Sequence, residues 1–203
     1  MRIGLIDYGA GNLTSVIKAL SYCDADVRIV PSSASLRAVQ ALVIPGVGHF
    51  GRTSSLDRAW RRAIRSRIES GVPVLGICLG MHFLFEGSDE APDVGGLGIF
   101  PDRCAKLGGT VKVPHVGWNA LDSTGRPSRL LRAIPNGAFA YFAHSYVVPD
   151  AVDAVATTTH GRPFASVVER DRVFGTQFHP EKSGATGLKI LANFLTVARE
   201  AAC

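Results

Sequence analysis

The chain has 203 residues, of which 46% are hydrophobic and 19% are charged, and its formal net charge at pH 7 is +5. This length suits one α/β domain with a substantial core or at most two small domains, and no apolar run approaches the ~20 residues that a membrane-spanning helix needs. The positive charge is mostly arginine and accompanies no nucleic-acid-binding signature, so we expect neither a membrane nor a nucleic acid as partner.

Targeting and cysteine patterns narrow the class further. The N-terminal stretch Met1–Asp7 lacks the basic-then-apolar shape of a signal peptide, which predicts a cytoplasmic protein. No Cys-x-x-Cys pair occurs, and the six histidines show no ligand-like spacing. We therefore predict no disulfide, no metal site and no cofactor for a chain whose cysteines are Cys23, Cys78, Cys104 and Cys203.

The first part of the chain alternates predicted strands with predicted helices. Strands are expected at 2–6, 26–30 and 41–44. Between the first two, a helix carries an apolar stripe at i, i+3, i+4 and i+7, formed by Leu13, Val16, Ile17 and Leu20. This alternation is typical of a parallel sheet covered on both faces, in which ligands bind beyond the carboxyl ends of the strands.

An arginine-rich segment follows and leads into another apolar strand at 72–77. Six arginines fall between Arg52 and Arg67. On a helix, four of them share one face and the apolar residues share the other: Arg58, Arg61, Arg62 and Arg65 lie opposite Leu56, Trp60, Ala63, Ile64 and Ile68. We interpret the basic face as a solvated helix surface rather than a nucleic-acid-binding patch.

After residue 88 the pattern changes to short β-like segments separated by glycine and proline turns. It predicts a mainly antiparallel region continuous with the same sheet. The expected strands are 98–100, 105–107, 110–113, 118–121, 139–142, 147–148, 154–159, 164–169 and 173–178. A helix at about 186–199 closes the chain, and since no linker divides it, we predict a single domain over residues 1–203.

Cys78 lies at the junction of the strand 72–77 and a predicted helix, with Gly76 and Gly80 two residues to either side. This spacing is typical of a nucleophile elbow, a tight turn that leaves no room for neighbouring Cβ atoms. Such a turn would present the sulfur to a cleft at a helix N-terminus, where the thiolate is favoured. A buried structural cysteine between packing glycines fits the spacing equally well.

His179-Pro180-Glu181, after the last predicted strand, supplies what a cysteine nucleophile needs. In extended backbone, residues two apart project to the same side, so the carboxylate of Glu181 could hold one ring nitrogen of His179. The other nitrogen could then act on the thiol as base and on the leaving group as acid. A His-x-Glu pair is usually a surface pair, and its position at the end of a strand after an elbow cysteine favours catalysis.

Taken together, Gly76–Gly80 and Phe178–Glu181 resemble the nucleophile motif and the triad completion of the class I, triad-type glutamine amidotransferases. Three further stretches are similar to the glutaminase subunits of imidazole glycerol phosphate synthase: Asp7–Leu13, Pro114–Asn119 and Tyr141–Tyr146. This resemblance, which covers the chain end to end, implies an α/β, three-layer fold. A mostly parallel central sheet would be flanked by helices and joined by an additional antiparallel β region.

The resemblance also implies an activity. Cys78, with His179 and Glu181, would attack the side-chain amide of glutamine and release ammonia, and water would then release glutamate from the thioester. The oxyanion would be held by N–H groups of Leu79 and of the loop residues Val47 and Gly48, a loop that in the family rearranges under the influence of a partner. The residues implied in glutamine binding are Gly48, His82, Glu90, His144, Ser145 and Tyr146.

Position 82 departs from the family pattern. The family usually has glutamine four residues after the nucleophile, where this chain has His82. Either the imidazole contacts glutamine in place of the amide, or it packs near the cleft in the first turn of the helix, which we favour.

The resemblance finally implies a heterodimer with the cyclase subunit, a (β/α)₈ barrel that receives the ammonia in histidine biosynthesis. The interface candidates are Asn12, Trp118, Asn119 and Lys182. One alternative is a paralogous glutaminase that feeds another acceptor. Others are a cysteine-elbow protease, redox sensor or chaperone, against which His179 and Glu181 argue, and a regulatory binding module, against which the complete triad argues.

Overall fold

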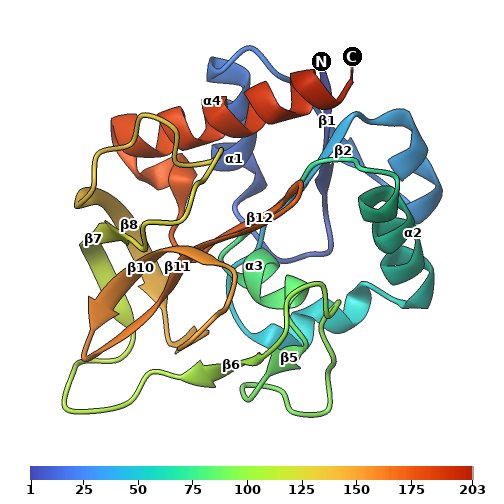
Figure 1. Cartoon of the computed structure of the whole chain (residues 1–203). Coiled ribbons are helices and arrows are strands. Elements are labelled where there is room, and N and C mark those ends of the chain that lie inside the picture. Colours follow the sequence, from blue (N-terminus) through green and yellow to red (C-terminus); the bar gives the residue numbers. More distant parts are fainter. Residues whose placement is uncertain (203) are drawn as a thin grey trace.

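The computed structural model describes residues 1–202, and Cys203, one of the four cysteines considered above, lies outside them. A nine-stranded sheet runs through the molecule (Figure 1). In spatial order its strands are β2 (Asp26–Val30), β1 (Arg2–Ile6), β3 (Ala41–Ile44), β4 (Val74–Ile77), β12 (Val173–Thr176), β11 (Arg162–Arg170), β10 (Ala154–His160), β7 (His115–Ser123) and β8 (Ala138–His144). The five strands from β2 to β12 pair in parallel, and the pairs from β12 to β8 are antiparallel.

Helices cover both faces of the parallel strands. On one face, α1 (Leu13–Tyr22) and α4 (Gly184–Ala201) pack in one core cluster with Val43 of β3. On the other face, α2 (Arg58–Glu69) and α3 (Leu79–Leu84) pack in a second cluster with Leu42 of the same strand. Because neighbouring strand residues point to opposite faces, one apolar strand supplies both cores. The three-layer α/β fold with an added antiparallel region is thus confirmed.

Shorter elements complete the chain. Three 3₁₀ turns are η1 (Ser33–Ala38), η2 (Phe50–Ser55) and η3 (Pro180–Lys182). A separate three-stranded sheet is formed by β5 (Gly87–Ser88), β6 (Arg103–Lys106) and β9 (Tyr146–Val147). No helix within residues 1–202 combines the length and the apolar character needed to cross a membrane.

Two predicted strands, 98–100 and 110–113, are wrong. The backbone N–H groups of Gly98, Ile99 and Phe100 donate to carbonyls at the end of α3 instead of to a neighbouring strand. Segment 110–113 leads into the cis peptide bond between Val113 and Pro114 and joins no ladder. Both segments are apolar enough to look like strands, but one caps a helix and the other is a loop.

The basic face of α2 is only partly solvated. Arg58 and Arg62 are exposed as predicted. Arg61, however, donates to the carbonyls of Gly95 and Gly96, both at 2.8 Å, and its guanidinium lies 5.0 Å from the centre of the Phe83 ring. Arg65 donates to the carbonyl of Leu97. Arg61, which is half-buried, and Arg65, which is exposed, therefore also hold the loop after α3 in place, a structural role in addition to the predicted solvated face.

Glu169 of β11 is expected to contribute to the stability of the antiparallel end of the sheet, and this contribution can be measured. Its buried carboxylate accepts hydrogen bonds from the Ser128 hydroxyl at 2.6 Å and from the backbone N–H groups of Arg129 and Leu130 at 3.1 and 3.3 Å. Glu169→Ala is expected to lower the free energy of unfolding by about 2–4 kcal/mol, because it leaves these donors unpaired. Urea denaturation measures the loss. The exposed Glu200→Ala is the control, expected to stay within about 0.5 kcal/mol of wild type; a similar result for Glu169→Ala would contradict the prediction.

Candidate functional site

A cleft of about 280 Å³ opens at the carboxyl ends of the parallel strands. It is lined by the loop after β3, by the turn between β4 and α3, by the end of β8 and the residues that follow it, and by the loops after β5 and before β7. The lining residues are Gly48, His49, Cys78, Leu79, His82, Glu90, Pro114, Ala143, His144, Ser145 and Tyr146. Most of the residues predicted for the site thus share one cleft, although they come from distant parts of the sequence.

Cys78 occupies the predicted elbow between β4 and α3, with φ 52° and ψ −108°. A non-glycine residue in such a conformation stores roughly 1–3 kcal/mol of strain. The turn is closed tightly: a Cβ on Gly76 would lie 2.6 Å from the Gly80 carbonyl oxygen, and a Cβ on Gly80 would overlap the carbonyl oxygen of Ile44. Cys78 is the N-cap residue of α3, and its side chain borders the cleft with 6% of the residue exposed.

His179 and Glu181 form a buried pair beside this cysteine. The Nδ1 atom of His179 lies 2.9 Å from Oε1 of Glu181, and both side chains are 2% exposed. Burial opposes the charged imidazolium, but hydrogen bonds to Cys78 and Glu181 and the negative charges of both groups raise the pKa of His179 to about 10. The imidazole is therefore protonated at neutral pH and can pair with a thiolate.

The backbone brings this pair together differently from the prediction. β12 ends at Thr176, and Glu181 lies in the 3₁₀ turn η3, so the two residues do not share an extended strand. His179 itself is extended, with φ −98° and ψ 96°, as expected for a residue before proline. Pro180 then begins the turn that folds the carboxylate back onto the ring.

The predicted oxyanion site is closed in this structure. The N–H of Leu79 donates to the carbonyl of Gly46 at 3.4 Å, so one of the two expected donors is already occupied. Gly48, with φ 92°, lines the cleft, whereas Val47 is 38% exposed and does not. A loop that places a carbonyl at this point cannot stabilise an oxyanion without changing conformation.

The residues predicted to bind glutamine all border the cleft. Glu90 accepts a hydrogen bond from the N–H of Phe50 at 2.7 Å, which fixes its carboxylate beside the loop after β3. Burial lowers the pKa of His144 to about 2, and its Nδ1 lies 3.1 Å from the carbonyl of Tyr146. His82 bonds to Gln177, at a Nε2 to Oε1 distance of 2.8 Å.

Comparison with known proteins decides the family. The class-I glutamine amidotransferase family profile matches residues 4–198. The chain is 43% identical over 196 residues to the imidazole glycerol phosphate synthase subunit HisH of Desulfitobacterium hafniense strain Y51, covering 95% of this chain and 92% of the relative. It is 44% identical over 194 residues to the subunit of that name from Methanocaldococcus jannaschii, covering 95% and 98%.

The chain belongs to the class-I glutamine amidotransferases, in the family of HisH subunits. Its fold is also similar to the solved structure of PurLQS from Thermotoga maritima, with a TM-score of 0.76, 18% identity and coverage of 96% of this chain and 97% of the other. The sequence resemblance and the fold class are thereby confirmed.

The interface candidates of this amidotransferase fall into two groups. Trp118 is 55% exposed, its ring packs edge-on against Tyr141 at 6.2 Å, and the ammonium of Lys182 lies 5.9 Å from the centre of that Tyr141 ring. The side chains of Asn12, which is exposed, and of Asn119, which is half-buried, are engaged in hydrogen bonds within the chain. Asn12 caps α1 through Ser15, and the side-chain amide of Asn119 donates to the Thr159 carbonyl at 3.0 Å.

Some residues of the amidotransferase site escaped the sequence analysis. His115 of β7 lies 3.0 Å from His144, between their Nδ1 and Nε2 atoms, and His49 and Pro114 line the cleft. Gln177 contacts both His82 and Cys78. Its position two residues before His179, within the predicted strand 173–178, was the available signal.

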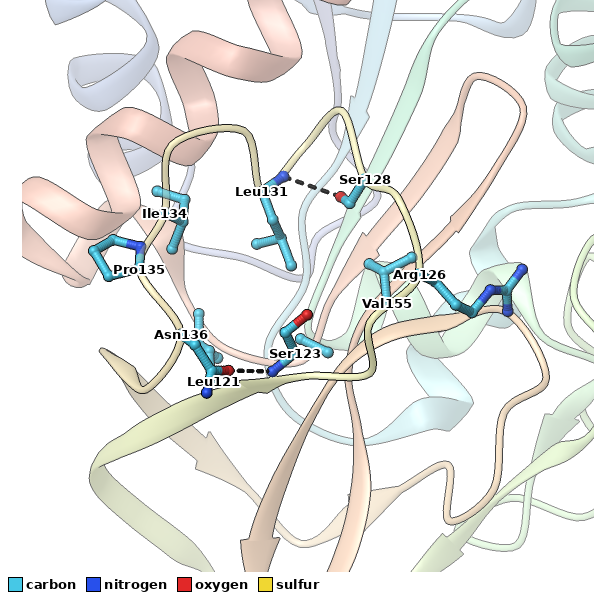
Figure 2. A pocket seen from close by; sticks show the side chains of 10 residues that line it. Leu121, Ser123, Arg126, Ser128, Leu131, Ile134, Pro135, Asn136 and Val155 are labelled. Atoms are coloured by element: carbon cyan, nitrogen blue, oxygen red, sulfur yellow. Dashed lines mark hydrogen bonds between the residues drawn. The ribbon is translucent and has the colours of Figure 1, made fainter.

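A second hollow lies away from the amidotransferase cleft, between the end of β7 and the segment that follows it (Figure 2). Its polar groups bond to one another: the N–H of Leu131 donates to Ser128 at 3.0 Å, and the N–H of Ser123 to Asn136 at 2.6 Å (Figure 2). It contains no nucleophile with a base and none of the predicted site residues. Within residues 1–202, no three His, Cys, Asp or Glu side chains gather in a way that could hold a metal ion.

Proposed function

We propose that Cys78, His179 and Glu181 are the catalytic triad by which this chain hydrolyses glutamine to glutamate and ammonia. The observation that carries the proposal is the hydrogen bond between the elbow cysteine, which lines the cleft, and the buried His179–Glu181 pair behind it. Membership of the class-I glutamine amidotransferases supports the choice of substrate.

The proposed reaction begins from a Cys78 thiolate and a His179 imidazolium. The thiolate attacks the side-chain carbonyl carbon of glutamine, and the carbonyl electrons move to oxygen to form an oxyanion. As the oxyanion collapses, the C–N bond breaks, and the imidazolium gives its proton to the leaving nitrogen, which departs as ammonia. His179, now neutral, takes a proton from water as the water attacks the thioester, and glutamate leaves with regeneration of the thiolate. Glu181 holds the ring orientation through Nδ1.

We further propose that the loop after β3 sets the rate. Because the Gly46 carbonyl occupies the N–H of Leu79, the isolated chain should stabilise the oxyanion poorly. Withdrawal of that carbonyl, with an N–H of Val47 or Gly48 turned inward, would supply two donors. In comparable sites one such donor is worth roughly 3–4 kcal/mol.

The partner that we propose is a cyclase subunit with a (β/α)₈ barrel, which receives the ammonia and makes imidazole glycerol phosphate in histidine biosynthesis. The HisH names of the relatives support this pairing. Trp118 and Lys182 offer an exposed aromatic and cationic contact, and Asn12 is exposed as well. The side chains of Asn12 and Asn119 would also act through the backbone that they fix. We also propose that residues 1–203 form one domain, and that the protein is cytoplasmic, where the thiols of Cys23 and Cys104 stay reduced.

Co-expression with the cyclase tests the proposal. The two subunits should co-purify, and ¹⁵N from amide-labelled glutamine should appear in the imidazole product with little label in the medium. Glutamine hydrolysis by the isolated chain should be slow and should rise with the barrel and its ligand. Full hydrolysis by the isolated chain would overturn the loop proposal, and labelled product without association would overturn the partner.

The pH dependence of hydrolysis should reflect the raised pKa of His179. Its proton is present at neutral pH and is lost as pH rises through about 10, so kcat/KM should stay level from about pH 7.5 to 9 and fall above that range. His82 and His144 are not expected to titrate in this range, because burial lowers their pKa values to about 4 and about 2. A fall in activity centred between pH 6 and 8 would contradict the prediction.

A further inference from the structure

Gln177 lies fully buried just after β12 and links two residues of the cleft. Its Oε1 is 2.8 Å from Nε2 of His82 in α3, and its amide nitrogen is 3.9 Å from the sulfur of Cys78. The backbone at this point is fixed on both sides. The backbone N–H of Gln177 donates to the backbone carbonyl of Ser166 at 2.9 Å, and the backbone N–H of Cys78 donates to the backbone carbonyl of Thr176 at 2.7 Å. The amide therefore sits between an imidazole and the proposed nucleophile.

The direction of these hydrogen bonds follows from the charge state of His82. Burial lowers the pKa of His82 to about 4, so at neutral pH the ring is neutral and carries one N–H. The Oε1 atom of an amide can only accept, and the Nε2 atom that faces it must therefore hold the proton. With Oε1 engaged in this way, the amide N–H groups of Gln177 turn away from His82 and toward the sulfur.

We propose that His82 and Gln177 form a relay in which His82 orients the Gln177 amide so that an N–H donor faces the thiolate of Cys78. Gln177 touches the reacting sulfur, and His82 is a positioning residue that acts through it. The relay deepens the proposed glutaminase mechanism and rests on it for the role of Cys78. It gives the thiolate a second hydrogen-bond donor besides the imidazolium of His179.

The N–H of His82 matters because the end of an amide side chain carries an accepting oxygen on one side and a donating NH₂ group on the other. If the Gln177 amide turned over, its oxygen would face the thiolate, and these two atoms, one partly and one fully negative, would repel each other. The bond from His82 to Oε1 disfavours that orientation, since turning over would either set an N–H against the Nε2–H or force the neutral ring into its other tautomer. A side chain at position 82 without a donor would leave the amide free to adopt either orientation.

Other ionisable groups around the sulfur do not replace this donor. His179 and Glu181 approach from the loop after β12, and Tyr8 from the loop after β1. Tyr8 carries no charge at neutral pH, and burial raises its pKa further; among residues 1–202 its hydroxyl has no hydrogen-bond partner. Burial likewise raises the pKa of Cys104, which stays a neutral thiol.

Alkylation of Cys78 by iodoacetamide tests the relay without glutamine or a partner. The full-length chain is treated over pH 5–10, and the modified fraction of the Cys78 peptide is followed by mass spectrometry. Loss of a donor to the thiolate moves the midpoint of the rate profile up by about one pH unit, which is a tenfold lower thiolate fraction. The remaining thiolate is intrinsically about threefold more nucleophilic, because reactivity rises with basicity. The rate profile of a variant that lacks the donor is therefore expected to cross that of wild type. Alkylation of the variant would be about three- to fourfold slower below the midpoint and about threefold faster on the plateau at high pH.

Four variants separate the parts of the relay. Gln177→Met removes the donor, and His82→Phe removes the group that orients it, so both are expected to give crossing profiles, with the smaller shift for His82→Phe. His82→Gln restores an N–H toward Gln177 and is expected to follow wild type within twofold. Thr176→Val is the matched control and should also follow wild type, because Thr176 is a buried neighbour in β12 whose hydroxyl finds no hydrogen-bond partner in the part of the chain that the structure describes. Thermal melts show that each variant is folded.

The outcomes decide the proposal independently of the glutaminase reaction. Profiles of His82→Phe that overlap with wild type, or of His82→Gln that match His82→Phe, overturn the relay. If Gln177→Met does not fold, the two His82 variants still give the answer. Crossing profiles together with an absence of glutamine hydrolysis in the cyclase complex would leave the relay intact and overturn the proposed function instead.

Discussion

Replacement of Cys78 by alanine is expected to lower glutamine hydrolysis in the cyclase complex by at least about 10⁴-fold, because no other group can form the thioester. The fold should survive, since only one sulfur atom is removed from a residue at the rim of the cleft. Release of glutamate measures the loss of activity, and co-purification with the cyclase shows that the variant is native. Turnover within tenfold of wild type would exclude Cys78 as the nucleophile.

Cys104→Ala is the matched control for that variant. Cys104 is fully buried in the second core cluster, so its truncation should cost about 1 kcal/mol of stability through a small cavity. Activity per folded molecule should stay within twofold of wild type. The two cysteines are thus expected to show opposite effects, with activity lost at position 78 and stability lost at position 104.

The backbone at position 78 adds a second comparison. Cys78 holds φ 52°, which glycine adopts without strain and alanine does not. Cys78→Gly should therefore be more stable than Cys78→Ala by about 1 kcal/mol, although both are inactive. Equal stabilities would mean that the elbow stores no strain at this residue.

Features that depend on local pattern could be predicted from the sequence. The strands β1, β2 and β3 match their predicted ranges, because each is a short, mostly apolar run that ends before a polar residue or a proline. The helix α1 contains the predicted apolar stripe from Leu13 to Leu20. The elbow at Cys78 was also foreseeable, because only glycine allows the approach of backbone to backbone at positions 76 and 80.

Features that depend on the tertiary hydrogen-bond partner of a backbone or side-chain group could not be predicted. Segment 98–100 has a strand-like composition, yet its N–H groups bond to the end of α3. No pattern in the sequence indicates that the Gly46 carbonyl occupies the N–H of Leu79, since a peptide plane can face either way in a glycine-rich loop. Gln177 was hidden for a related reason: it follows the buried strand β12 directly, and its role depends on contacts with His82 and Cys78 that the sequence does not show.

Gly80→Ala is expected to lower the free energy of unfolding by more than about 4 kcal/mol, a larger loss than for most single substitutions. The added Cβ would overlap the carbonyl oxygen of Ile44, and that oxygen belongs to the end of β3, a fully buried strand that cannot retreat. Relief requires α3 to move away from the sheet, which would carry Cys78 out of the cleft. Activity and stability should therefore fall together, as urea denaturation and glutamate release would measure.

Gly108→Ala provides the control for this effect. Gly108 is exposed, does not have a positive φ, and a Cβ there would meet nothing within 4 Å. Its replacement should leave activity unchanged and alter the free energy of unfolding by less than about 1 kcal/mol. Any change should be toward higher stability, because alanine lowers the conformational entropy of the unfolded chain. Equally small effects at both glycines would contradict the prediction. They would mean that the elbow can accept a Cβ at position 80 despite the nearby carbonyl oxygen of Ile44.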